Sequence, residues 1–256
     1  MKPVRVPDLR AMKERGEKIA VLTAYDFTMA RILDRAGVEV ILVGDSVGMV
    51  VLGYDTTLPV TLDMMIHHTA AVSRGAKRAL IIADMPFLTF QLSLEEAMRN
   101  AGRLIQEGGA AAVKIEGGRQ IVDTAKRLVD IGIPVMGHLG LTPQSVHQLG
   151  GFRPQGRDSE AAERLMQDAE ILEKAGVFGI VLESIPADLA GRMSSSLKIP
   201  TIGIGAGPQC DGQVLVINDM LGFTDGPVPP FAKQYAQLSE QILSAVRAYI
   251  EDVHKR

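Results

Sequence analysis

Eight short apolar segments recur along the chain, and most of them are bounded by Gly, Pro or Asp residues that favour turns. Stretches with the apolar spacing of amphipathic helices separate most neighbouring segments. The segments do not alternate cleanly between apolar and polar residues, which is typical of strands covered on both faces of a parallel sheet. They are IAVLTA from Ile19, VILVGDS from Val40, ALIIADM from Ala79, AAVKIEG from Ala111, PVMGHLG from Pro134, GIVLES from Gly179, TIGIGAG from Thr201 and QVLVIND from Gln213. This order of elements predicts an α/β fold with a parallel sheet.

The number of predicted strands favours closure of the sheet into a (β/α)8 barrel of the TIM-barrel class. The chain has 256 residues, close to the roughly 250 residues of a single barrel domain. We therefore predict one domain over residues 1–256. An open, doubly wound sheet is the structural alternative, because the number of strands does not by itself establish closure.

Two segments outside the strands are expected to form helices. The segment VPDLRAMKERG, before the first strand, predicts a short N-terminal helix that could plug the bottom of the barrel. Residues 231–256 predict a long amphipathic C-terminal helix. Its apolar face would contain Tyr235, Leu238, Ile242, Ala245 and Tyr249. That face could cover the barrel or extend a subunit interface, and the sequence leaves both possibilities open.

Composition and charge exclude several classes of partner. The net charge of -3 and the lack of any run of basic residues argue against binding to nucleic acid. No segment approaches the roughly 20 apolar residues that span a membrane, and the first ten residues lack the apolar core of a signal peptide. The single cysteine, Cys210, has no partner for an internal disulfide. These features predict a protein of the cytoplasm.

Polar and ionisable residues are concentrated near the ends of several predicted strands. In a barrel, the C-terminal ends of the strands carry the chemistry. Carboxylates buried there among Val, Ile and Leu cost several kcal/mol each unless a cation or hydrogen-bond donors compensate them. Their concentration in these positions therefore predicts an active site. The residues are Asp45, Ser46, Asp84, Lys114, Glu116, His138, Glu183, Ser184, Asn218 and Asp219.

Carboxylates without clustered Cys or His residues suit a hard cation such as Mg2+ better than zinc. The adjacent His67 and His68 face different sides of a predicted helix, which argues against a shared ligand role. Lys114 could form a Schiff base, but the neighbouring acids favour a charged ammonium that binds a carboxylate or balances an oxyanion. The glycines from Gly203 to Gly207 could cradle a phosphate or could allow close backbone packing, and both interpretations remain open.

Five motifs resemble those of the ketopantoate hydroxymethyltransferase family, in the family's order and spacing. They are VGDSVG around Asp45, then IADMPF, VKIEGG, GHLGLTPQ and GIGAGPQCDGQVLV, and the resemblance extends from about Tyr25 to Phe223. The resemblance implies a Mg2+-dependent barrel that transfers a one-carbon unit from 5,10-methylenetetrahydrofolate to 3-methyl-2-oxobutanoate. The product would be 2-dehydropantoate, on the route to pantothenate. The resemblance also implies a homo-oligomer, a decamer in bacteria.

The resemblance assigns roles to the strand-end residues. Asp45 and Asp84 match the metal ligands of the family, and Glu116 matches an acid that holds the metal through water. Glu183 matches the proposed catalytic base. The groups expected around the carboxylate and oxygens of the 2-oxo acid are Asp45, Ser46, Asp84, Lys114 and His138.

Two other functions remain as alternatives. One is a metal-dependent lyase or mutase of the isocitrate lyase type, which shares strand-end acids and enolate chemistry. Such enzymes usually carry a catalytic cysteine on a loop after the fourth or fifth strand, whereas Cys210 lies far later. The other is a non-catalytic, metabolite-binding barrel, which the concentration of strand-end acids disfavours.

Overall fold

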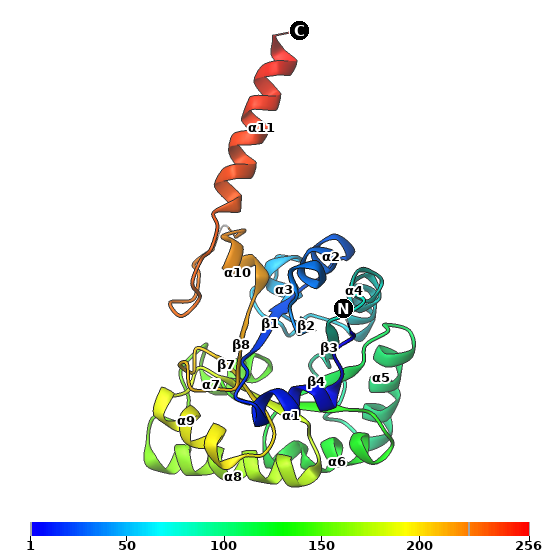
Figure 1. Cartoon of the computed structure of the whole chain (residues 1–256), viewed down its shortest axis with the longest axis vertical. Helices are drawn as coiled ribbons and strands as arrows, with labels where there is room; N and C mark the ends of the chain where they lie inside the picture. The colour runs from blue at the N-terminus through cyan, green and yellow to red at the C-terminus, as the bar shows by residue number, and fades with distance from the viewer. Residues whose placement is uncertain (1, 225, 256) are drawn as a thin grey trace. The chain divides into compact units, whose positions relative to one another are not determined.

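The computed structural model, which describes residues 2–224 and 226–255, contains a closed barrel of parallel strands β1 to β8 in chain order (Figure 1). Each strand pairs with the next one along the chain, and the closed order confirms the predicted (β/α)8 barrel. The open-sheet alternative is wrong. The strands are β1 (Ile19–Thr23), β2 (Val40–Val43), β3 (Leu80–Asp84), β4 (Ala112–Glu116), β5 (Val135–Gly140), β6 (Gly179–Glu183), β7 (Thr201–Ile204) and β8 (Gly212–Leu215).

Helices surround the strands and fill most of the connections between them (Figure 1). The short connection from β7 to β8 has no helix in the described structure. Within the described residues, no helix is both long and apolar enough to cross a membrane. The helices that precede or connect the strands are α1 (Val6–Glu14), α2 (Phe27–Ala36), α3 (Val47–Val50), α4 (Leu62–Gly75), α5 (Leu94–Gln106), η1 (Arg119–Ile121), α6 (Val122–Asp130), η2 (Pro143–Ser145), α7 (Val146–Leu149), α8 (Ser159–Ala175) and α9 (Ala187–Ser196).

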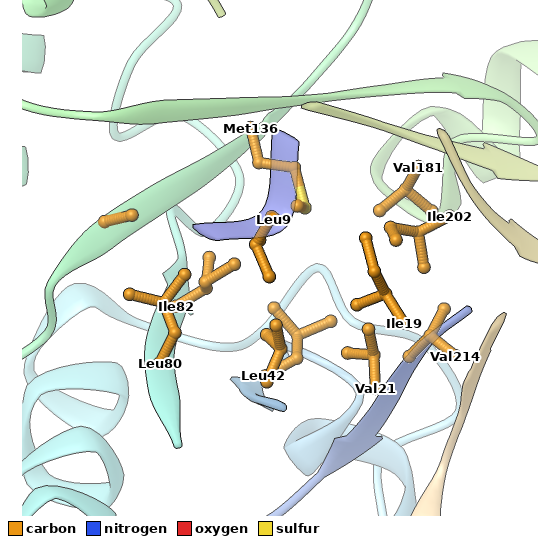
Figure 2. Close-up of a cluster of buried hydrophobic side chains, with 12 residues drawn as sticks. Leu9, Ile19, Val21, Leu42, Leu80, Ile82, Met136, Val181, Ile202 and Val214 are labelled. Carbon is orange, nitrogen blue, oxygen red and sulfur yellow. The ribbon is translucent and has the colours of Figure 1, made fainter. Parts of the chain in front are cut away.

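The N-terminal helix α1 closes the end of the barrel at which the strands begin. Its start is held by a hydrogen bond from the backbone N of Arg5 to the carboxylate of Asp8, 2.8 Å long. Leu9 is fully buried in the cluster of apolar side chains that fills this end. Figure 2 shows it pointing into the space between Ile19 and Met136. The prediction of a plugging helix is confirmed.

A lysine of α1 adds a polar link to the same end of the barrel. Nζ of Lys13 donates to the carbonyl oxygens of Ser194 and Ile199 at 2.8 and 3.0 Å. It also lies 2.8 Å from Oδ2 of Asp211, whose carboxylate accepts from the backbone N of Thr201. The three contacts of Lys13 join α1 to the segments that precede β7 and β8, so the helix is fixed by both apolar and polar contacts.

The chain forms two compact units, Met1–Val214, which carries the barrel, and Leu215–Arg256. In the second unit, the long helix α11 spans Leu238–His254, so the prediction of a helix beginning at residue 231 is wrong at its start. The backbone N of Tyr235 instead donates to the carbonyl oxygen of Met220, in the short helix α10 (Ile217–Leu221). No residue of α11 is buried in the described structure. The covering or interface role of its apolar face, and the single domain over the whole chain, stay predictions.

Replacing Leu9 with Ala tests the plug. Removing a fully buried leucine side chain lowers the free energy of unfolding by about 2–5 kcal/mol, because transfer energy is lost and a cavity remains. Urea unfolding of the purified protein measures the change. Arg10→Ala, at an exposed position on the same helix whose contact is an ion pair with Glu14, is the matched control and changes stability by less than about 1 kcal/mol. Equal losses in the two variants would contradict the packing role of Leu9.

Candidate active site

The register of the parallel strands brings the predicted site residues to one end of the barrel. Asp84, the last residue of β3, pairs in register with Lys114 of β4. Glu116, the last residue of β4, pairs with His138 of β5. Because side chains two apart on a strand point to the same face, Lys114 and Glu116 share one side of β4. The structure thus places four of the predicted residues on neighbouring strands.

Asp45 and Glu183 complete this arrangement, which we call the strand-end cluster. Asp45 follows β2 by two residues, and its backbone N donates to Oδ2 of Asp84 at 3.1 Å. Glu183 is the last residue of β6, and its Oε2 lies 3.1 Å from Nε2 of His138. All members are buried except Glu183, whose side chain is 15% exposed and therefore accessible from solvent. The strand-end cluster consists of Asp45, Asp84, Lys114, Glu116, His138 and Glu183.

Ion pairs connect the cluster from one strand to the next. Nζ of Lys114 lies 3.0 Å from Oδ1 of Asp84 and 3.9 Å from Oε1 of Glu116. Nδ1 of His138 lies 3.4 Å from Oε1 of Glu116 and 3.1 Å from Nζ of Lys114. With the contact from His138 to Glu183, a continuous chain of charged side chains runs from β3 to β6.

The backbone at the end of β6 is held by a close approach from β5. Gly140 has a φ of 94°, and a Cβ there would collide with the carbonyl oxygen of Glu183. The next residue, Leu141, donates its backbone N to that same oxygen at 2.8 Å. Ser184, directly after Glu183, has a φ of 48°, a left-handed conformation that costs a non-glycine residue energy. The backbone that carries Glu183 is therefore fixed on both sides.

The pKa values of the buried acids are shifted in different directions, because burial and neighbouring acids raise them and the basic side chains lower them. Burial raises the pKa of Asp45 well above its usual value of 3.8, and the nearby carboxylates of Asp84 and Glu116 raise it further. Burial also raises the pKa of Asp84, although Lys114 partly offsets this effect. For Glu116, the nearby His138 and Lys114 and the hydrogen bond from the backbone N of Gln144 outweigh burial and lower the pKa.

The two basic members are held in their charged forms. Burial lowers the pKa of Lys114, but the carboxylates of Asp84, Glu116 and Asp45 outweigh it, so the pKa is raised. An ammonium held so firmly does not act as a Schiff-base nucleophile at neutral pH. Burial and Lys114 lower the pKa of His138, whereas its contacts with Glu116 and Glu183 raise it to about 9.

The donor set fits a divalent cation. If all members are ionised, four carboxylates face the two cationic groups Lys114 and His138, which leaves two negative charges without compensation. Oδ1 of Asp84 and Oε1 of Glu116 are buried and accept no well-aligned hydrogen bond within the described residues. No group of three or more His, Cys, Asp or Glu side chains surrounds one metal position in the part of the chain that the structure describes. Two carboxylates with water in the other positions is a usual environment for Mg2+, which keeps several waters.

Ser46 lies beside the cluster, where its Oγ is 2.9 Å from the hydroxyl of Tyr25. Tyr25 is buried and comes from the segment after β1, so this pair joins the ends of the first two strands. A Cβ at Gly44 would lie 2.7 Å from Oγ of Ser46, which shows how little space the turn after β2 leaves. The contact with Tyr25 and the tight turn at Gly44 restrict the positions that the hydroxyl of Ser46 can adopt.

Gln144 is a site residue that the sequence analysis missed as an individual, although it lies in the motif GHLGLTPQ. It is buried, and its Nε2 donates to Oδ2 of Asp45 at 2.8 Å. Its backbone N donates to Oε2 of Glu116 at 3.0 Å. Its place in that motif was the one signal for it in the sequence, because Gln144 lies in η2, after the end of β5 at Gly140.

Several other predicted residues lie elsewhere. Asn218 and Asp219 were expected at the end of the eighth strand, but β8 ends at Leu215 and both residues belong to α10 in the second unit. His68 lies in α4, where its Nδ1 is 2.7 Å from the carbonyl oxygen of Tyr25. Cys210 is buried, in agreement with a structural role.

Comparison with known proteins identifies the family. The sequence profile of the ketopantoate hydroxymethyltransferase family matches residues 3–256. The chain belongs to this family. The 3-methyl-2-oxobutanoate hydroxymethyltransferase of Syntrophus aciditrophicus (strain SB) is 61% identical over 245 residues, which cover 96% of this chain and 90% of that protein. The enzyme of the same name from Thermoanaerobacter sp. (strain X514) is 58% identical over 247 residues, with the same two coverages. The predicted family, and with it the prediction of a hydroxymethyltransferase enzyme, is confirmed.

Solved structures outside the ketopantoate hydroxymethyltransferase family share its barrel. A 2,3-dimethylmalate lyase, described as a member of the PEP mutase/isocitrate lyase superfamily, superposes with a TM-score of 0.63 at 18% sequence identity. The match covers 100% of this chain and 86% of the lyase. At this identity the likeness concerns the fold alone.

Replacing Asp45 with Asn tests the electrostatic cost of the cluster. In the metal-free protein, a raised pKa of Asp45 means that its contribution to stability is present below pH 3.8 and is lost as the pH rises through the raised value. Asn carries no such loss, and its side-chain oxygen still accepts from Gln144. With EDTA present, Asp45→Asn is therefore more stable than the unsubstituted protein by about 0.5–2 kcal/mol at pH 8, and the difference shrinks towards pH 4.

Urea unfolding at several pH values measures this difference, with and without Mg2+. Mg2+ stabilises the unsubstituted protein because it binds the folded state, and it has little effect on Asp45→Asn. Equal stabilisation of both proteins by Mg2+ would contradict the placement of a cation at Asp45.

Proposed function

We propose that the chain catalyses the transfer of a hydroxymethyl group from 5,10-methylenetetrahydrofolate to 3-methyl-2-oxobutanoate. The product is 2-dehydropantoate, a precursor of pantothenate. The observation that carries the proposal is the buried strand-end cluster, with its excess of carboxylates, in a member of this family. Such a cluster suits a reaction in which negative charge develops on an oxygen close to a cation.

In this proposal, Asp45 and Asp84 hold Mg2+, and Glu116 holds it through water. The two aspartates come from neighbouring strand ends and are joined by the hydrogen bond from the backbone N of Asp45 to Oδ2 of Asp84. When bound, Mg2+ supplies positive charge beside the carboxylate and the carbonyl oxygen of the 2-oxo acid.

Glu183 removes the proton from C3 of the 2-oxo acid. It is the most exposed member of the cluster, at 15%, and the others are buried. Its backbone is fixed between Gly140 and Ser184, which limits the positions that the carboxylate can reach. Nε2 of His138 lies 3.1 Å from Oε2 of Glu183, and the second carboxylate oxygen accepts the proton.

Lys114, Ser46 and His138 bind and orient the oxygens of the 2-oxo acid. The ammonium of Lys114 lies between Asp84 and Glu116, so it is held charged beside the two acids. The hydroxyl of Ser46, positioned by Tyr25, supplies a neutral donor. A carboxylate is best recognised by one fixed charge together with directional donors.

The carbon–carbon bond forms between C3 of the deprotonated 2-oxo acid and the methylene carbon of the folate. Both bonds from that carbon to the folate nitrogens break, and water supplies the oxygen of the new hydroxymethyl group. Each nitrogen gains a proton, one from that water and one that balances the proton taken from C3. Tetrahydrofolate leaves. The proton taken from C3 rests on Glu183, which the solvent can reach for its release.

The quaternary structure and location complete the proposal. The enzyme acts as a homodecamer in the cytoplasm. The apolar side of α11, which includes Ile242, Val246 and Tyr249, is exposed in the described structure and would favour association.

One incubation tests the function. Purified protein, Mg2+ and 3-methyl-2-oxobutanoate are combined with and without 5,10-methylenetetrahydrofolate in deuterated water. Exchange of the C3 proton is followed by NMR, and product by mass spectrometry. The proposal expects exchange in both mixtures and hydroxymethylated product only with the folate. Exchange without any product would remove the folate step, and the absence of exchange in both mixtures would contradict the enolisation.

Glu183→Gln tests the base. The amide retains the shape and the contact with His138 but accepts no proton, so C3 exchange falls by about 100-fold or more, while Mg2+ and the 2-oxo acid still bind. Calorimetry measures binding and NMR measures exchange. Glu163→Gln, on the surface helix α8, is the matched control and exchanges at the rate of the unsubstituted protein. Exchange at that rate in Glu183→Gln would assign the base to another residue.

A further inference from the structure

The side chain of Gln144 contacts more of the strand-end cluster than any role given above requires. Its Nε2 donates both to Oδ2 of Asp45, at 2.8 Å, and to the carbonyl oxygen of Met85, at 3.0 Å. Its backbone N donates to Oε2 of Glu116 at 3.0 Å. One loop residue thus joins the ends of β2, β3 and β4.

The chemistry of its neighbours fixes the orientation of the Gln144 amide. Oδ2 of Asp45 and the carbonyl oxygen of Met85 are both acceptors, so only the NH2 end of the amide satisfies them. The amide oxygen then faces Nε2 of Gln91, 3.4 Å away in the loop after β3. A flipped amide would place oxygen against two oxygens at a buried site, which is strongly unfavourable.

This orientation gives the two carboxylate oxygens of Asp45 different roles. Oδ2 is engaged by Gln144, and the carboxylate cannot rotate freely without breaking that bond. In the metal role proposed above for Asp45, Oδ1 is the oxygen that binds the cation. The amide is neutral, so it fixes Asp45 without lowering the negative charge that attracts the metal. Hydrogen bonds from groups outside the ligand set commonly orient metal ligands in this way.

We propose that Gln144 is a positioning residue that holds Asp45 in the orientation that binds Mg2+, and holds Glu116 through its backbone N. The inference rests on the proposed metal role of Asp45. Gln144 touches neither the 2-oxo acid nor the reacting carbon. Its loss therefore weakens metal binding but leaves the chemical step intact once the metal is bound.

Gln144→Met tests the inference, because methionine has the same unbranched length and no donor. The backbone N that serves Glu116 remains in this variant. Mg2+ is titrated calorimetrically into the protein, with and without 3-methyl-2-oxobutanoate and in the absence of folate. We expect the dissociation constant for Mg2+ to rise by about 10–100-fold. The rate of C3 proton exchange recovers when Mg2+ is raised to saturation.

Gln91→Leu is the matched control. Gln91 donates to the oxygen end of the Gln144 amide, and its own oxygen accepts from the backbone N of Phe90. Its loss therefore leaves both donor bonds of Gln144 in place and changes the Mg2+ affinity only slightly. If Gln144→Met does not fold, as judged by circular dichroism and thermal unfolding, Gln144→Asn replaces it. That amide sits on a stem one methylene shorter and does not reach Asp45, so the same loss of affinity is expected.

The outcomes separate this inference from the proposed function. Unchanged Mg2+ affinity in Gln144→Met, with normal binding by the unsubstituted protein, overturns the positioning role and leaves the function standing. An exchange rate that stays low at saturating Mg2+ also overturns it, because Gln144 would then act in the chemical step. Failure of the unsubstituted protein to bind Mg2+ under any of these conditions overturns both the metal assignment and the inference.

Discussion

The ion pair between Lys114 and Asp84, 3.0 Å apart and buried, is the interaction on which the site depends. Without that ammonium, the neighbouring acids would face one another in an apolar barrel end, and they would bind protons instead of remaining charged. With it, four carboxylates still face only two basic side chains, Lys114 and His138. That deficit is the physical basis for cation binding, because a divalent ion supplies the missing charge without any rearrangement of the strands.

The barrel itself follows from features that the sequence displays directly. Eight uninterrupted apolar runs, most of them separated by helical stretches, predict a parallel sheet and favour its closure, which the strand order confirms. The predicted start of the C-terminal helix was wrong, because one backbone hydrogen bond outweighs the apolar spacing of the sequence there. Tyr235 fits the apolar spacing of α11, but its backbone N bonds to Met220 and the helix begins only at Leu238. Asn218 and Asp219 were misplaced for a related reason, since β8 ends three residues before the first of them.

The members of the strand-end cluster could be found from the sequence because strand geometry fixes where they point. A residue at the end of a parallel strand reaches the same barrel end as its neighbours, whatever its loops do. Gln144 could not be found in that way. It lies in η2, after the strand, and its reach to Asp45 and Met85 depends on the path of a loop that no periodicity describes. It is also uncharged, so an argument from the cost of buried charge does not reveal it.

The two ends of the barrel have opposite energetic roles. At the end where the strands begin, Leu9 fills the apolar core and Lys13 satisfies carbonyl oxygens and the carboxylate of Asp211. These apolar and polar contacts stabilise the fold at that end. At the other end, burial and repulsion raise the pKa of Asp45, and Ser184 holds a strained backbone conformation. Both features cost stability in the metal-free protein. A chain selected for stability alone would neutralise that end, so its retention as a charged cluster is itself an argument that the charge serves binding and catalysis.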